Sequence, residues 1–110
     1  MLFLIELNHV TSGTPLAPET GRAFIEHIIF PTLARAEEHL KAHKILAGGA
    51  VLGRVSLRFI VEADSLANVD QLLTSLPIWP LADTRVTPLL AFAERRQHAQ
   101  ALLESLQTRS

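Results

Sequence analysis

Three side chains near the start of the sequence could move a proton. Glu26 and His27 are adjacent in a long segment with an apolar stripe, and His9 lies near the end of the first apolar run. Carboxylate and imidazole groups act as general acids and bases when they lie within hydrogen-bond reach of a substrate. On a helical wheel Glu26 flanks the apolar stripe, whereas His27 projects nearly opposite it, which favours a solvent-exposed His27.

Three further residues are candidates for substrate binding. Arg22 projects near the buried side of the same segment, where it either meets a substrate carboxylate or extends its charge into solvent. Trp79, the only tryptophan, lies in a proline-braced loop and either walls a pocket or fills one in a neighbouring subunit. Phe59 lies on the apolar side of a predicted strand.

His39 and His43 are four residues apart, a spacing that could hold a metal ion. No motif supplies a third ligand, so we favour histidines at the negative end of a helix dipole and predict no metal site. The chain has no cysteine, which excludes disulfides and thiolate chemistry. Serine–histidine nucleophile pairs, phosphate-binding glycine loops and nucleotide fingerprints are absent as motifs, and no cofactor is expected.

The first half of the chain should supply a strand and a long helix. Residues 2–10 form an apolar run typical of a strand, followed by a loop at 11–15. A helix is predicted over 18–44, with Pro18 and Glu19 in its first turn. Pro31 should kink this helix or split it in two, because proline removes a backbone hydrogen bond. The apolar stripe consists of Ile25, Ile28, Ile29, Leu33, Ala36 and Leu40.

Two strands are predicted in the middle of the chain. The first, over 45–52, contains Gly48 and Gly49, which indicate a bulge or a close backbone approach. The second, over 55–62, is the clearest strand of the chain, because one set of alternate residues is wholly apolar. That apolar set consists of Val55, Leu57, Phe59 and Val61.

The rest of the chain predicts a second helix, a last strand and a C-terminal helix. Asp64 or Ser65 caps the second helix, which runs to about residue 75. After a stiff apolar loop at 76–80, residues 84–92 form the last strand, where Pro88 implies an edge position or a bulge. Residues 94–106 form the final helix. The residues of the second helix that should face inward are Leu66, Val69, Leu72 and Leu73.

This order, β-α-β-β-α-β plus a helix, predicts an α+β, ferredoxin-like fold with two helices on one face of an antiparallel sheet. The 110 residues make one domain, with a core at 1–92 and a C-terminal helix at 93–110. A net charge of -1 without a basic block argues against nucleic acid as a partner. No apolar run is long enough to span a membrane, and the N-terminus lacks a signal peptide, so a cytoplasmic location is the default.

The chain is expected to form a homo-oligomer. Its apolar fraction of 48% is high for a small domain. The face of the sheet away from the helices should carry Leu2, Leu4 and Ile60 beside a cross-strand pair of Glu6 and Arg58, and a second copy would cover it. The alternative is a monomer with a partly apolar exposed sheet. The C-terminal helix is a second candidate interface.

The segment from Leu76 through Pro77, Ile78 and Trp79 to Pro80 resembles that of muconolactone isomerases. The start of the chain, the glycine-containing second strand and the helix opening near Asp64 are also similar to that family. The resemblance covers most of the chain through residue 92. It implies a dimeric α+β barrel, and a cofactor-free isomerase that shifts a proton within an unsaturated lactone in a pocket between sheet and helices. Where that family carries charged residues in the first helix, this chain has uncharged, mostly apolar ones at 28–33.

We therefore predict an isomerase-like protein that acts on a small apolar ring or lactone compound. Glu26 or His9 is the expected base, Arg22 the anion anchor, and Trp79, His27 and Phe59 further substrate contacts. One alternative is a non-catalytic domain of the same fold that binds small molecules or only assembles. Another is a cofactor-independent monooxygenase-like enzyme, which would need a pocket histidine such as His9.

Overall fold

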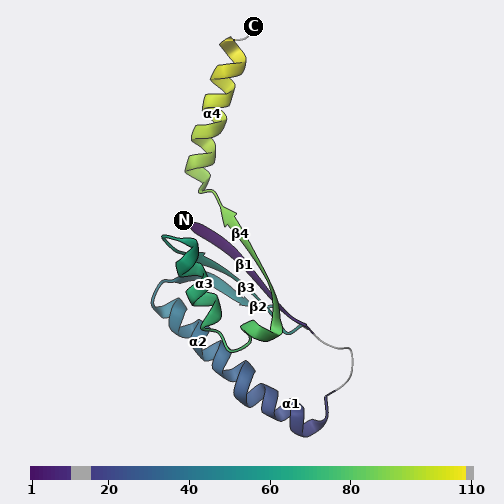
Figure 1. Cartoon of the computed structure of the whole chain (residues 1–110). Helices are drawn as coiled ribbons and strands as arrows, with labels where there is room; N and C mark the ends of the chain where they lie inside the picture. The colour runs from purple at the N-terminus through teal and green to yellow at the C-terminus, as the bar shows by residue number, and fades with distance from the viewer. Residues whose placement is uncertain (11–15, 109–110) are drawn as a thin grey trace.

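The predicted α+β architecture is confirmed in the computed structural model of the chain, which describes residues 1–10 and 16–108. The loop expected at 11–15 lies outside the described residues. The elements follow the predicted ferredoxin-like order and end with the added C-terminal helix (Figure 1). They are β1 (Leu2–His9), α1 (Pro18–Phe24), η1 (Ile25–Ile29), α2 (Phe30–Lys41), β2 (Ile45–Ala50), β3 (Ser56–Glu62), α3 (Leu66–Thr74), η2 (Trp79–Leu81), β4 (Ala82–Leu89) and α4 (Phe92–Thr108).

The four strands form one antiparallel sheet in the order β2-β3-β1-β4. Helices α2 and α3 cover one face of it (Figure 1). β4 begins at Ala82 and ends at Leu89, slightly ahead of the predicted 84–92. It lies at the edge of the sheet, as Pro88 implied, because an edge strand can lack one backbone donor.

The core lies between the sheet and these two helices. Phe3, Ile5 and Leu7 are at most 1% exposed and face the helices as predicted. Opposite them in register are Val61, Phe59 and Leu57, respectively. Helix α3 adds Val69, Leu72 and Leu73, and the loop that follows it adds Leu76 and Ile78.

The inward position predicted for Leu66 is wrong, because its side chain is 70% exposed. Leu66 is the first residue of α3, directly after the N-cap Ser65, whose Oγ accepts a hydrogen bond from the Asn68 N–H at 3.2 Å. At this first turn the side chain lies outside the contact between helix and sheet. Ser65 is one of the two residues predicted as the cap.

The long first helix contains a π-helical stretch, η1, between α1 and α2. The Phe30 N–H donates to the Ile25 carbonyl, five residues back, instead of to the usual fourth residue. Pro31 follows directly and has no N–H with which to continue the ladder. The kink or split expected near Pro31 is therefore replaced by a π-helical stretch just before it. The helix ribbon continues through this stretch (Figure 1). The helix ends at Lys41, before the predicted residue 44.

Gly48 marks a close approach of two strands. β2 has a register irregularity between Ile45 and Ala47. A Cβ atom on Gly48 would overlap the side chain of Phe59 and the carbonyl oxygen of Arg58 on β3. The predicted bulge or close backbone approach is confirmed, and Gly48 is the residue that requires it.

Helix α4 extends away from the rest of the domain (Figure 1). None of its described residues is buried. Together with the compact body it gives the chain dimensions of 70 × 31 × 23 Å. In the part of the chain that the structure describes, no helix has both the length and the apolar character needed to cross a membrane.

Candidate functional site

A largely apolar cavity of about 490 Å³ lies between the first helix and the inner face of the sheet. Its size falls within the range of small-molecule sites, about 300–1,000 Å³. β1, the helical segment from α1 to α2, the turn between β2 and β3, and the loop before η2 form its walls. Apolar side chains that line it include Leu7, Phe24, Ile25, Ile29, Val55 and Leu57.

His9 brings an imidazole into this apolar cavity. It continues the inward-facing alternation of Ile5 and Leu7 at the end of β1, and its backbone N–H donates to the Val55 carbonyl at 3.0 Å. Its ring packs against that of Phe24, with centroids 4.8 Å apart. Nδ1 of His9 is buried and has no hydrogen-bond partner among the described residues. A buried polar atom without a partner costs about 1–3 kcal/mol, so a bound molecule that supplies a partner gains that amount.

Arg54 is the one charged residue among those found to line the cavity. It lies in the turn between β2 and β3, directly after Gly53, whose φ of 80° allows the chain to reverse. Within residues 1–10 and 16–108, its guanidinium has neither a hydrogen bond nor an ion pair. A free cation at the edge of an apolar cavity can hold an anionic oxygen of a ring compound.

Two buried hydroxyl groups fix the walls of the cavity. Thr32 is 2% exposed, and its Oγ1 accepts a hydrogen bond from the Ile78 N–H at 3.1 Å. This bond ties α2 to the loop before η2. Ser56 is 6% exposed and donates to Oδ1 of Asn8 at 2.9 Å. Both hydroxyls have partners within the protein, so they position the cavity, whereas Nδ1 of His9 is buried in its lining without a partner among the described residues.

A polar network behind Ser56 extends across the sheet. Nη2 of Arg58 also donates to Asn8 Oδ1, at 3.0 Å, and its Nε lies 3.6 Å from a Glu6 carboxylate oxygen. The predicted pair of Glu6 and Arg58 is confirmed by this distance and by their register. Arg85 on β4 approaches the same carboxylate at 3.9 Å. These charges therefore belong to the sheet face opposite the cavity.

Three of the predicted site residues lie outside the cavity lining. Arg22 in α1 and Glu26 and His27 in η1 are exposed. Ile25 and Ile29, which flank Glu26 and His27 in sequence, are the η1 residues that face the cavity. A helical wheel predicts Glu26 beside the apolar stripe, but Glu26 is not among the residues found to line the cavity that contains His9.

The two predicted aromatic contacts are also separated from His9. Phe59 is 4% exposed and lines a smaller cavity of about 190 Å³ together with Leu33 and Ala36. Trp79 is 37% exposed in η2 and is not part of the apolar lining. His9 is thus the predicted residue that the structure brings to the cavity. The roles of the others stay predictions.

Helix α2 ends between the two histidines, His39 and His43. Nε2 of His39 lies 3.0 Å from Ser75 Oγ, whereas His43 has a φ of 60° and starts the turn into β2. Among residues 1–10 and 16–108, no group of three or more histidine, cysteine, aspartate and glutamate side chains is placed to hold a metal ion.

Sequence reasoning missed Arg54 and Phe24 as site residues. The signal for Arg54 was present, because Gly53 and Arg54 lie at the turn between two predicted strands, and that turn returns the chain to the end of β1. Phe24 had no such signal. It precedes the apolar stripe by one position, and only the π-helical geometry and the contact with His9 identify it.

No family model matches the chain, and the search of curated proteins gave no match. Solved structures do show similarity. A complex of 5-chloro-2-hydroxyhydroquinone dehydrochlorinase from Burkholderia phenoliruptrix AC1100 with 2,5-dihydroxybenzoquinone matches with 27% identity and a TM-score of 0.59. The match covers 82% of this chain and 94% of that one. Muconolactone isomerase matches with 16% identity and a TM-score of 0.63, over 83% of this chain and 90% of its own.

Both matches extend over more than four fifths of this chain. They agree with the resemblance carried by the segment from Leu76 to Pro80 and with the observed order of strands and helices. The chain has a muconolactone isomerase-like fold.

Proposed function

We propose that the chain is a cofactor-free enzyme that moves a proton within a small, largely apolar ring compound bound in the apolar cavity. The buried Nδ1 of His9, which has no partner among the described residues, is the observation that carries this proposal. It lies in a cavity whose lining is otherwise almost entirely apolar. An imidazole is suited to the task because it exchanges protons close to neutral pH.

His9 would act first as the base and then as the acid. It takes a proton from a ring carbon next to a carbonyl, and the electron pair left behind moves onto the carbonyl oxygen as an enolate. Arg54 is the cation that can stabilise this developing negative charge. Return of the same proton to a different ring carbon restores the carbonyl and moves the double bond. The ring of Phe24 holds the imidazole in place.

The comparisons suggest two substrate classes for such a step. The fold shared with muconolactone isomerase favours an unsaturated lactone, in which the proton is returned to the ring. The 27% identity with 5-chloro-2-hydroxyhydroquinone dehydrochlorinase favours a second candidate, a hydroxylated chloro-substituted ring. In that case the ring reacts as its keto tautomer, whose enolate expels chloride from a saturated ring carbon, so the ring loses one proton and one chloride ion in total.

Both candidates can be tested with the purified full-length chain and no added cofactor. Unsaturated lactones are followed by ultraviolet absorbance, and chlorinated hydroxyquinols by chloride release. We expect turnover of at least one class, and we expect His9→Gln to lower kcat by about 10²- to 10⁴-fold, the usual loss when a general acid–base group is removed. Matched controls are His98→Gln, on the exposed α4, and Glu26→Gln, outside the cavity.

The variants separate the proposal from its alternatives. A full rate in His9→Gln together with a large loss in Glu26→Gln would make Glu26 the base and would contradict the role of His9. Saturable binding of ring compounds by wild type without turnover would show a non-catalytic binding domain of the same fold.

A further inference from the structure

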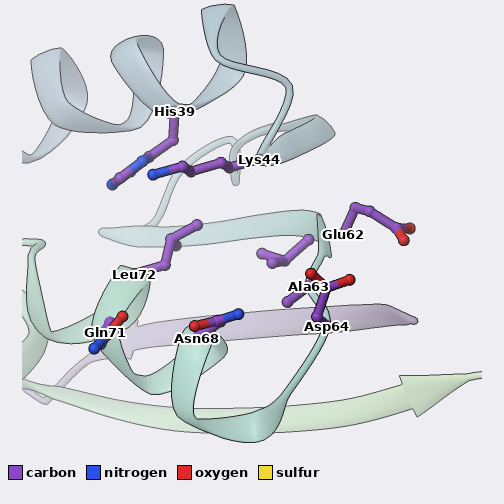
Figure 2. Close-up of a pocket in the computed structure, with 9 residues that line it drawn as sticks. His39, Lys44, Glu62, Ala63, Asp64, Asn68, Gln71 and Leu72 are labelled. Atoms are coloured by element: carbon purple, nitrogen blue, oxygen red, sulfur yellow. The ribbon is translucent and has the colours of Figure 1, made fainter.

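A second, polar cavity of about 430 Å³ lies at the opposite end of α2 (Figure 2). The end of α2 and the start of β2 form one wall, and α3 with the chain leading into it forms the other. Val61 and Leu72, both part of the core, supply an apolar floor. None of its lining residues belongs to the lining of the apolar cavity that contains His9.

Backbone hydrogen bonds fix the first wall. His43 adopts a left-handed φ of 60°, its N–H donates to the Leu40 carbonyl at 3.1 Å, and the Lys44 N–H donates to the His39 carbonyl at 3.0 Å. This pair of bonds is a Schellman motif, which closes the helix and joins residues five apart. Lys44 is therefore held beside His39, and Figure 2 shows their side chains together on one side of the cavity.

His39 contributes a neutral, oriented imidazole. Ser75 Oγ donates to the Leu72 carbonyl at 2.6 Å, so its oxygen accepts the hydrogen on His39 Nε2 at 3.0 Å. Partial burial, and next the charge of Lys44, lower the pKa of His39 and favour the neutral ring. With Nε2 as the donor, Nδ1 is left as a hydrogen-bond acceptor.

The opposite wall carries a carboxylate and two amides. Asp64, Asn68 and Gln71 line it, and Figure 2 shows them facing His39 and Lys44 across the cavity. In the part of the chain described here, the side chains of these three residues and the ammonium of Lys44 have no hydrogen bond or ion pair. Four polar side chains without hydrogen-bond partners among the described residues therefore face the cavity from its two walls.

Glu62 does not add a second free carboxylate. Its Oε1 accepts a hydrogen bond from the N-terminal ammonium of Met1 at 3.2 Å, and its side chain turns away from the cavity (Figure 2). The charges that face the cavity are therefore one cation, Lys44, and one anion, Asp64, on opposite walls. A ligand with a single net charge would be repelled by one of them, whereas a ligand with separated opposite charges satisfies both.

We propose that this polar cavity is a second ligand site, distinct from the apolar one, and that it binds a small zwitterion of the free α-amino acid type. The carboxylate of the ligand pairs with Lys44 and accepts from the amides of Asn68 or Gln71. Its ammonium group pairs with Asp64. A short apolar side chain, such as that of alanine, valine or leucine, lies on the floor formed by Val61 and Leu72.

Isothermal titration calorimetry on the full-length chain tests this proposal. Alanine, valine and leucine are compared with the matching carboxylic acids, which lack the ammonium, and the matching amines, which lack the carboxylate. We expect saturable binding of at least one amino acid with a Kd of about 1 mM or lower, and binding of the acid and the amine at least about tenfold weaker.

Two variants locate the binding. Lys44→Met and Asp64→Asn should each weaken it by at least about tenfold, which corresponds to about 1.4 kcal/mol. Lys41→Met and Asp70→Asn are matched controls on α2 and α3 that remove the same charges outside the cavity, and they should bind normally. His9→Gln should also bind normally, because its side chain belongs to the other cavity. Circular dichroism verifies the fold of every variant.

The proposal is overturned if no amino acid binds at concentrations of about 10 mM, or if a carboxylic acid alone binds as tightly as the amino acid. It is equally overturned if Lys44→Met and Asp64→Asn fold and bind like wild type. Loss of binding in His9→Gln would instead place the amino acid in the apolar cavity.

Discussion

At the scale of single residues, His9 and Glu26 show how backbone geometry decides which acid–base group reaches the cavity. His9 is carried inward by strand alternation, a period of two that the sequence makes visible through Ile5 and Leu7. Glu26 was placed by a helical wheel that assumes a regular helix. The π-helical stretch at Ile25–Ile29 breaks that regularity, so the wheel could not give its direction.

Gly48 gives a stability prediction at the same scale. Gly48→Ala should lower the free energy of unfolding by about 1–3 kcal/mol, because its new Cβ meets the side chain of Phe59 and the strands must move apart. Urea denaturation measures this loss. The neighbouring Gly49→Ala is the matched control, since a Cβ there meets nothing within 4 Å. Equal unfolding free energies for the two variants would contradict the close approach.

His39 gives a pH prediction. Partial burial, then Lys44 and Arg35, lower its pKa from the ordinary value of 6.5. The folded protein therefore binds this proton less readily than the unfolded chain. The stability associated with neutral His39 is complete above pH 6.5 and is lost as the pH falls from there through the lowered folded pKa.

Wild type should accordingly lose more unfolding free energy than His39→Gln when the pH falls from about 7.5 to about 5. Urea titrations at both pH values provide the measurement. His98→Gln, on the exposed α4, should retain the wild-type dependence. Identical pH dependences of wild type and His39→Gln would show that protonation of His39 does not oppose folding.

At the scale of elements, most of the fold could be predicted because each element has a local signal. The alternation of residues 55–62 identified β3 and its buried face, Ser65 marked the start of α3, and Pro88 marked an edge strand. What the sequence could not give was how the elements meet. The cavity lies between η1 and β1, which are separated in the chain, and the position of Arg54 at its edge depends on how the turn between β2 and β3 meets the end of β1.

A substitution at Thr32 tests one such contact, that between α2 and the loop before η2. Thr32→Val keeps the shape of the side chain but leaves the Ile78 N–H without its acceptor, because the bond runs from that N–H to Thr32 Oγ1. We expect a loss of about 1–3 kcal/mol in thermal or urea unfolding.

Thr74→Val is the control for this substitution, since its exposed hydroxyl donates to carbonyls of its own helix, those of Asp70 and Gln71. That variant should change stability by no more than about 0.5 kcal/mol. A Thr32→Val protein as stable as Thr74→Val would mean that the bond between α2 and the loop does not support the cavity.

At the scale of the whole molecule, the described residues form two apolar surfaces that one copy of the chain leaves uncovered. α4 has no buried residue, and Phe92 and Leu102 are 96% and 61% exposed. The outer face of the sheet carries Leu2, Leu4 and Ile60 around the pair of Glu6 and Arg58. Sequence alone indicated both surfaces, and the homo-oligomer remains a prediction.

Light scattering after size-exclusion chromatography should give a mass of at least twice the 12.1 kDa of one chain. Leu102→Glu should shift this mass toward the monomer if α4 forms an interface, because a charge would be buried there. Gln97→Glu adds the same charge elsewhere on α4 and should leave the mass unchanged. A monomeric wild type at concentrations of about 100 μM would contradict the oligomer, whose interface should hold well below that concentration.

The apolar cavity that contains His9 is the proposed place of the chemistry. The most direct test is a crystal structure of the full chain with the ring compound it turns over, or with a slowly reacting analogue. We expect the ring between Leu7, Ile29 and Leu57, with a polar or reacting atom about 3 Å from Nδ1 of His9. A ring bound in the polar cavity, or beside Glu26 and away from His9, would contradict it.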